Sequence, residues 1–195
     1  NIFYNNIFTL LKKIKCFSSI FAETEINDYH SITKDIVKIP SPEAYNISLI
    51  KKCLKKFNII ILSLGALKKE ELSKIIALTK NKKVIPMHCV SSYPLKAEDC
   101  NFYKLEYLKK FYKQVGYSGH YQGIEDAVYA IDNGAMLIEK HFTTNNNLAG
   151  RDNKFALLPK DFEYLSNYIK TRDKFQIKRG LGLQKCEKDV YKHYR

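Results

Sequence analysis

Short apolar runs rich in β-branched residues alternate along this chain with longer amphipathic segments. The runs begin roughly every 20 to 30 residues, which is the period of a strand followed by a helix. The predicted strands are residues 15–21, 36–39, 59–64, 84–90, 114–117 and 136–142. The predicted helices are residues 44–57, 67–79, 98–113, 123–133 and 159–179. Successive units of this kind predict a parallel sheet, and strands as apolar as 59–64 are typical of a sheet covered on both faces.

Two α/β architectures fit such a sheet, the doubly wound sheet and the (β/α)8 barrel. No GxGxxG or Walker A motif opens a predicted helix, which argues against a nucleotide-binding doubly wound sheet. Polar residues follow several successive predicted strands, and a barrel enzyme collects its chemistry at those ends. The sequence therefore predicts a TIM-type (β/α)8 barrel. Because a complete barrel typically has about 250 residues, we expect an N-terminally truncated one of about six βα units over residues 1–182, followed by a charged, loop-like tail over 183–195.

The chain carries 33 Lys and Arg against 20 Asp and Glu, a formal net charge of +13. This balance suits an anionic partner, although many of the lysines lie in predicted helices, where they are typical of a solvated face. No zinc-finger, RNP or helix-turn-helix signature accompanies the charge, so we do not expect nucleic-acid binding. No apolar run reaches about eighteen residues, so no membrane span is expected. Five cysteines without CxxC spacing predict neither a disulfide framework nor a zinc ribbon, and they favour a reducing, cytoplasmic location.

Two histidines, His120 and His141, each follow a predicted strand and lie one βα unit apart. Neighbouring parallel strands are about 4.8 Å apart, so two imidazoles at their ends can reach one metal ion, and imidazole suits transition-type divalent ions. The alternative for each is a structural or exposed histidine. His88 is a third histidine at a strand end, for which a hydrogen-bonded place in the pocket wall is the alternative to a ligand.

A lysine and several serines also occupy the predicted strand ends, and a barrel would bring them around one mouth. These residues are Lys38, Ser41, Ser63, Ser91 and Ser118. One ammonium and several hydroxyls predict a cradle for a phosphate or a carboxylate. Glu43 directly follows Ser41 and Pro42 and is either a base near the site or an acid in the first turn of a helix.

A third group comprises Tyr93, Glu139 and Asp152. Tyr93 precedes Pro94 in a predicted turn, and Asp152 lies in the long polar loop NNNLAGRDN that follows the His141 strand. Loops of this type often close over substrates, although an ordinary surface loop has the same composition.

Six segments in this order resemble the sialic acid synthase (NeuB-like) family, which includes N-acetylneuraminate, legionaminate and pseudaminate synthases. The segments are KIPSPE (38–43), ILSLG (61–65), HCVSSYP (88–94), VGYSGH (115–120), IEKHFT (138–143) and AGRD (149–152). The resemblance implies a (β/α)8 barrel followed by an antifreeze-like (SAF) domain, which is absent from these 195 residues. It also implies a cytoplasmic homodimer that condenses phosphoenolpyruvate with N-acetylmannosamine or a related amino sugar and releases phosphate.

The resemblance also implies roles for individual residues. His120 and His141 match the two ligands of a divalent metal, Mn²⁺ or Mg²⁺, and Glu43 matches a glutamate near the metal and the reacting carbon. The positions that match phosphoenolpyruvate-binding residues are Lys38, Ser41, Ser63, Ser91 and Ser118, with Ser19 as a further match. Tyr93 and Asp152 match positions that touch the amino sugar.

The sequence departs from the family at several positions. Leu64 replaces a threonine, Pro42 replaces a glycine, and Gly119 stands where bacterial synthases often have Asp. The first two strands of the family, which carry an acid, a lysine and amides of the site, are also missing. The alternative to a synthase is therefore a non-catalytic remnant or split-gene fragment that needs a partner segment, and we expect the isolated chain to associate through exposed strand edges and not to turn over substrate.

Overall fold

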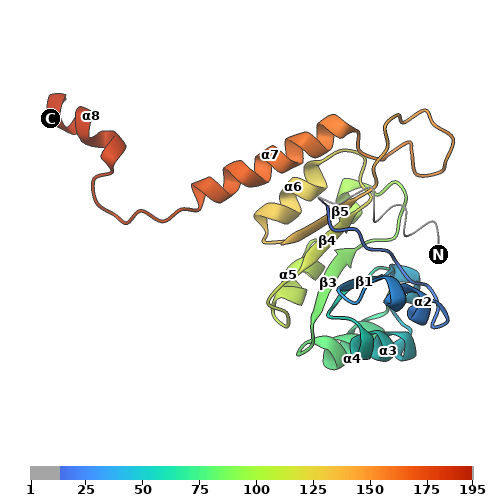
Figure 1. The fold of residues 1–195 in the computed structure, drawn as a ribbon. Coiled ribbons are helices and arrows are strands. Elements are labelled where there is room, and N and C mark those ends of the chain that lie inside the picture. The colour runs from blue at the N-terminus through green and yellow to red at the C-terminus, as the bar shows by residue number, and fades with distance from the viewer. Residues whose placement is uncertain (1–13, 195) are drawn as a thin grey trace.

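The computed structural model describes residues 14–194, and its centre is a parallel sheet curled into half of a barrel (Figure 1). The five strands are β1 (Ile36–Ile39), β2 (Ile59–Ser63), β3 (Val84–Cys89), β4 (Gly116–Gly119) and β5 (Leu137–Lys140). They lie in the order in which they occur along the chain, and every neighbouring pair is parallel. This topology confirms the predicted α/β class of an incomplete (β/α)8 barrel.

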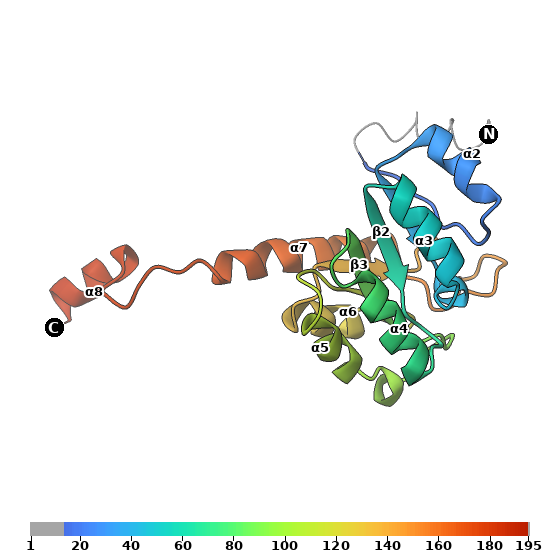
Figure 2. The same cartoon turned by 90° about the horizontal axis from the view of Figure 1, so that it is seen from below.

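The helices α2 to α6 follow one another around one side of the sheet (Figure 2). The α-helices are α2 (Glu25–Ile32), α3 (Ile47–Lys56), α4 (Lys69–Thr79), α5 (Tyr103–Lys109), α6 (Glu125–Asp132), α7 (Pro159–Phe175) and α8 (Lys188–His193). The long helix α7 runs outward and leads to α8 at the tip of an extended arm (Figure 1). Asp161 fixes the start of α7, because its carboxylate accepts a hydrogen bond from the Leu158 amide at 2.8 Å and Pro159 occupies the first turn.

Strand alternation separates an apolar core from a polar inner face. Val37 and Ile39 of β1, Leu62 of β2 and Tyr117 of β4 face the helices and are at most 1% exposed. Residues of opposite parity on the same strands face the inside of the arc, because successive side chains of a strand point to opposite faces. The outer residues hold the helices against the sheet, which leaves the inner positions near the strand ends available for polar side chains.

Single parallel bridges extend the sheet at both edges. Ser19 pairs with Lys38 beside β1, and Phe142 pairs with Leu157 beyond β5. The predicted strand over residues 15–21 is therefore reduced, within its described residues, to the Ser19 bridge, with hydrogen bonds from the Ile20 amide to the Lys38 carbonyl and from the Lys38 amide to the Ser18 carbonyl. Its place in the order of strands is nevertheless the predicted one.

Helix boundaries differ from the prediction where the backbone is interrupted. The predicted helix over 98–113 splits into the 3-10 turn Ala97–Asp99 and α5, because Asn101 adopts a positive φ of 48° between them. Strand β4 lies two residues later than predicted, in register with Met87 of β3 and Leu137 of β5 through Gly116. Helices α2 and α8 were not predicted, and α8 contradicts the loop-like reading of the last residues. None of the helices described is long and apolar enough to cross a membrane.

Candidate active site

An open pocket of about 410 Å³ lies at the carboxyl ends of the strands, within the size range of small-molecule sites. Nine of the eleven predicted site residues line it: Ser19, Lys38, Ser41, Ser63, Tyr93, Ser118, His120, His141 and Asp152. They come from both edges and the middle of the sheet, so the parallel topology brings together residues separated by more than a hundred positions in the sequence.

The two histidines face one another across neighbouring strand ends. The ring centroids of His120 and His141 are 5.4 Å apart, and the Tyr93 ring lies 4.1 Å from His120. His120 Nδ1 lies 2.9 Å from the Val90 carbonyl oxygen, so Nδ1 carries the hydrogen and donates to this oxygen, while the Nε2 of the neutral ring keeps its lone pair. Burial lowers the pKa of His120, an effect that the hydrogen bond to Val90 opposes, so the neutral ring is favoured.

His141 is held from two further sides. Its Nδ1 lies 3.7 Å from a carboxylate oxygen of Asp152, and the buried Phe155 ring packs against it at 5.2 Å. A carboxylate on one ring nitrogen is the usual orienting contact of a metal-binding imidazole. The loop that carries Asp152 therefore contacts the site directly.

Lys38 and Ser118 both donate to one carboxylate oxygen in the pocket. Lys38 Nζ is 2.6 Å and Ser118 Oγ 2.8 Å from Glu139 Oε1. The Lys38 side chain is 14% exposed, whereas that of Glu139 is 35% exposed. The most buried cation of the pocket thus already holds a carboxylate group, which demonstrates that the geometry accommodates one.

Ser63 and Ser41 complete the floor of the pocket. Ser63 Oγ is buried and has no hydrogen-bond partner among the residues described. Ser41 Oγ accepts a hydrogen bond from the Gly65 amide at 3.1 Å. A Cβ at Gly65 would lie 2.4 Å from Ser91 Oγ and 2.7 Å from Ser41 Oγ, so only glycine permits this close approach of the three segments.

Two of the predicted site residues lie outside the pocket lining. Glu43 lies in the 3-10 turn Ser41–Glu43, ahead of α3, and accepts a hydrogen bond from Asn46 Nδ2 at 3.1 Å. Ser91 is exposed next to Tyr93; burial raises the pKa of the Tyr93 hydroxyl, and a hydrogen bond with Ser91 opposes that shift. Their proposed roles stay predictions.

His88 points to the helix layer instead of the pocket. Its Nε2 donates to the Cys100 carbonyl at 2.7 Å, and its ring packs 5.5 Å from that of Tyr117. Burial lowers its pKa to about 4. The histidine is therefore a neutral core residue between β3 and α5, and it is not part of the pocket wall.

Several lining residues were not among the predicted site positions. They are Phe21, Pro40, Pro42, Cys89 and Arg151. Glu139, which the sequence reading grouped with Tyr93 and Asp152, also lines the pocket. Cys89 is in register with Ser118 of the adjacent strand, so the two-residue period of strands was a signal that could identify it. Arg151 directly precedes Asp152 and shares its loop, whereas nothing in the local sequence places Phe21 at the mouth.

The donor set of the pocket fits a transition-type divalent ion in part. Two imidazoles face each other, and one has its second nitrogen already hydrogen-bonded to a carbonyl, which is the arrangement that prepares a histidine for metal binding. Within residues 14–194, no group of three or more His, Cys, Asp or Glu side chains is placed to hold a metal ion. Among the described residues, the pocket therefore offers two facing imidazoles as candidate ligands.

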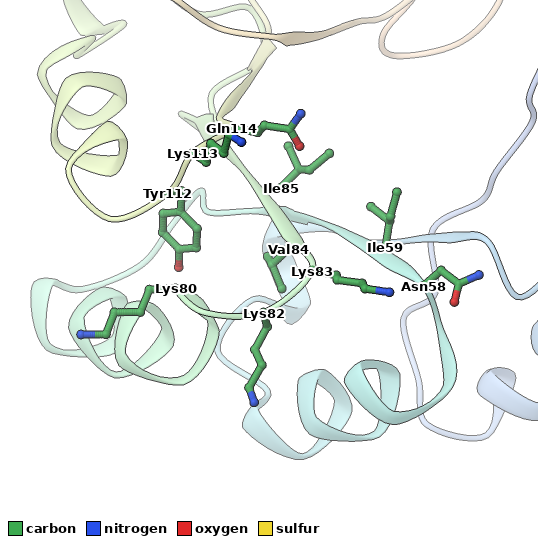
Figure 3. Close-up of a pocket in the computed structure, with 10 residues that line it drawn as sticks. All are labelled: Asn58, Ile59, Lys80, Lys82, Lys83, Val84, Ile85, Tyr112, Lys113 and Gln114. Atoms are coloured by element: carbon green, nitrogen blue, oxygen red, sulfur yellow. The ribbon is translucent and has the colours of Figure 1, made fainter.

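A second pocket lies at the opposite, amino end of the strands and is lined by four lysines (Figure 3). Figure 3 shows the side chains of Lys80, Lys82 and Lys83 pointing away from one another. The nearby Tyr112 hydroxyl is hydrogen-bonded to Thr79. Charge is abundant here, but the ammonium groups do not converge on one point.

A curled parallel βα sheet with converging polar groups at the carboxyl ends of its strands defines a protein of the (β/α)8-barrel class with a ligand site in the barrel mouth. The sequence narrows this class further. The chain belongs to the NeuB family, whose sequence model matches residues 8–179.

Named relatives agree with this assignment. The chain is 34% identical over 164 residues to the N,N'-diacetyllegionaminic acid synthase of Campylobacter jejuni, covering 81% of this chain and 48% of the relative. It is 33% identical over 180 residues to a pseudaminic acid synthase of the same species, covering 90% and 51%. The chain thus spans about half the length of the curated relatives it matches.

The fold comparison leads to the same family. The N-acetylneuraminic acid synthetase of Leptospira borgpetersenii, solved in complex with citrate, superposes with a TM-score of 0.84 at 30% identity. The match covers 98% of this chain and 68% of that structure. The resemblance predicted from the six sequence segments is therefore confirmed.

Proposed function

We propose that this chain forms the phosphoenolpyruvate-binding and metal-binding face of a nonulosonic acid synthase, in which phosphoenolpyruvate condenses with N-acetylmannosamine or a related amino sugar. The observation that carries the proposal is the convergence of one lysine, four serines and two histidines in a single pocket. Relatives named as legionaminic and pseudaminic acid synthases support the reaction class.

Phosphoenolpyruvate has two anionic groups, and the pocket has donors for both. Lys38 provides a charge-assisted donor, and the Ser63 hydroxyl is a buried donor with no partner among the described residues. Ser118 now donates to Glu139, so an incoming anion would take over two of the contacts that Glu139 makes. The Leptospira synthetase was solved in complex with citrate, which like phosphoenolpyruvate is a multiply charged anion, and this supports the proposal of an anion site.

His120 and His141 are the residues that would hold a divalent ion, Mn²⁺ or Mg²⁺. When bound, that ion supplies Lewis-acid polarisation of the open-chain sugar aldehyde. Tyr93 and Asp152 lie beside the histidines and are partly exposed, which supports our proposal that they contact the sugar. Tyr93 is 40% exposed, as expected for a residue at an open mouth.

The chemistry follows from the two substrates. Carbon 3 of phosphoenolpyruvate forms the new bond to the sugar aldehyde carbon, whose oxygen becomes a hydroxyl. Water adds its oxygen to carbon 2, and phosphate leaves from the resulting tetrahedral centre, so one water is consumed for each phosphate released. Lys38 and the serines orient the phosphoenolpyruvate for this attack and hold the phosphate charge. A homodimer and a cytoplasmic location belong to the same proposal.

Ligand binding by the chain itself is the direct test, because the chain spans about half the length of its curated relatives. We expect titration calorimetry to show phosphoenolpyruvate binding more tightly than inorganic phosphate or pyruvate alone. A Lys82→Met/Lys83→Met variant, altered only at the opposite pocket, should bind it equally well. Phosphate release with N-acetylmannosamine and Mn²⁺ is the second readout, for which we expect no turnover by the chain alone. Absence of phosphoenolpyruvate binding would contradict the proposal and favour the non-catalytic remnant.

A further inference from the structure

Behind the two histidines lies a buried ion pair that none of the proposed reaction steps uses. Lys140 Nζ is 2.9 Å from both carboxylate oxygens of Asp126 and 2.7 Å from the Tyr121 carbonyl oxygen. The Lys140 and Asp126 side chains are 2% and 1% exposed. An ammonium group has three donors, so these three contacts satisfy it completely.

Asp126 is in turn fixed from the helix and from the neighbouring strand. Its Oδ1 accepts the Ala127 amide at 2.8 Å, and its Oδ2 accepts the Tyr117 hydroxyl at 3.0 Å. The carboxylate therefore joins the start of α6 to β4 and, through Lys140, to β5. A network in which every member is satisfied rigidifies its surroundings.

The ammonium group is connected to both histidines through the backbone. Tyr121, whose carbonyl it binds, directly follows His120, and Lys140 itself directly precedes His141. Strands β4 and β5 are in register at Gly119 and Lys140, so the two histidines are the next residues on adjacent strands. Their ring centroids are 5.4 Å apart.

Gly119 leaves room for this network. A Cβ at this position would lie 2.2 Å from Asp126 Oδ2, 2.6 Å from the Tyr117 ring and 3.1 Å from Lys140 Cδ. The Gly119 side of β4 therefore faces the ion pair directly. Glycine is therefore favoured at position 119 of the SGH segment because a side chain there would collide with the Lys140–Asp126 network.

We propose that Lys140 and Asp126 are positioning residues, which set the spacing and orientation of His120 and His141 from the far side of the sheet. This inference rests on the proposed function, because it assigns the pair a role toward the metal-binding imidazoles. This role can be distinguished from a contribution to stability alone. A buried ion pair can often be replaced by apolar side chains of similar volume without loss of stability, so such a replacement tests positioning separately.

The double variant Asp126→Leu/Lys140→Met separates the two roles. It removes both charges together, so we expect a urea midpoint close to that of the unmodified chain. Mn²⁺ affinity, measured by electron paramagnetic resonance, should fall by roughly 10- to 100-fold, the range found when orienting partners of ligands are lost. In the metal-free chain, the nuclear Overhauser contact between the His120 and His141 rings should weaken. Full retention of both the Mn²⁺ affinity and this contact would overturn the inference.

Two further variants keep the test decisive. Gly119→Ala places a methyl group against Asp126 and should reproduce the loss of affinity even if the double variant does not fold. Glu23→Gln/Lys52→Met removes an exposed ion pair far from the site and should change neither readout. If the unmodified chain binds no Mn²⁺, the metal-binding part of the proposed function is wrong. The nuclear Overhauser contact between the His120 and His141 rings then tests the positioning role independently.

Discussion

Both ends of the sheet carry lysines, yet only at the carboxyl end does a lysine share a pocket with several other polar groups that converge. At the carboxyl end, Lys38 is largely buried and points into a pocket shared with hydroxyls and imidazoles. At the amino end, Lys80, Lys82 and Lys83 are exposed and point apart (Figure 3). Net charge attracts anions from a distance, but specific binding requires donors that converge in a partly desolvated space. The comparison predicts that Lys38 binds an anionic ligand, whereas the lysines of the amino end only interact with solvent.

Loss of one histidine at the carboxyl end should have the largest effect. His141→Ala removes one of two imidazoles that face each other, so we expect Mn²⁺ affinity to fall by at least about 100-fold while the urea midpoint stays nearly unchanged, because the side chain is partly exposed. Electron paramagnetic resonance of free Mn²⁺ measures the affinity. His193→Ala in α8 is the matched control. Equal affinities in the two variants would remove His141 from the ligand set.

Replacing a lysine at each end tests the comparison directly. Lys38→Met should weaken phosphoenolpyruvate binding by about 10- to 150-fold, because a charge-assisted hydrogen bond typically contributes about 1.5–3 kcal/mol. Lys83→Met removes the same charge from the other end, where we expect a change below about twofold. Titration calorimetry at one fixed salt concentration measures both. Similar losses in the two variants would mean that overall charge, and not the pocket, binds the ligand.

The sequence predicted the carboxyl end better than the exact outline of the fold. The period of two in strands and the parallel order of βα units sufficed to bring Lys38, Ser118 and His141 together, because that geometry is common to every parallel sheet. The strand over 15–21 was reduced to one bridge at Ser19, since an edge segment has a neighbour on one side only. The helix break at Asn101 and the orientation of His88 depend on packing between strand and helix, which cannot be predicted from the local sequence.

Glu139 sharpens the comparison, since it is the acid that contacts the buried lysine of the carboxyl end. Its carboxylate accepts from both Lys38 and Ser118, so it competes with any anion for these donors. Glu139→Gln should therefore strengthen phosphoenolpyruvate binding in the absence of metal by about fivefold, or roughly 1 kcal/mol for a partly exposed ion pair. Glu163→Gln on the exposed face of α7 is the control for the change in net charge. Weaker binding in Glu139→Gln would show that the carboxylate assists the ligand instead of competing with it.

The smallest expected effect concerns Ser63, where binding and stability should move in opposite directions. Its hydroxyl is buried at the pocket floor without a partner among the described residues, and such a group costs about 1–3 kcal/mol of desolvation. Ser63→Ala removes that cost and leaves only a small cavity, so we expect the free energy of unfolding to rise by about 1 kcal/mol in urea titrations. Phosphoenolpyruvate affinity should fall about two- to fourfold, because one neutral hydrogen bond of about 0.5–0.8 kcal/mol is lost. Ser73→Ala in α4, where the hydroxyl already bonds the Lys69 carbonyl, should leave affinity unchanged. A Ser63 variant that loses stability without losing affinity would place the hydroxyl in the core of the fold and remove it from the set of residues that bind the ligand.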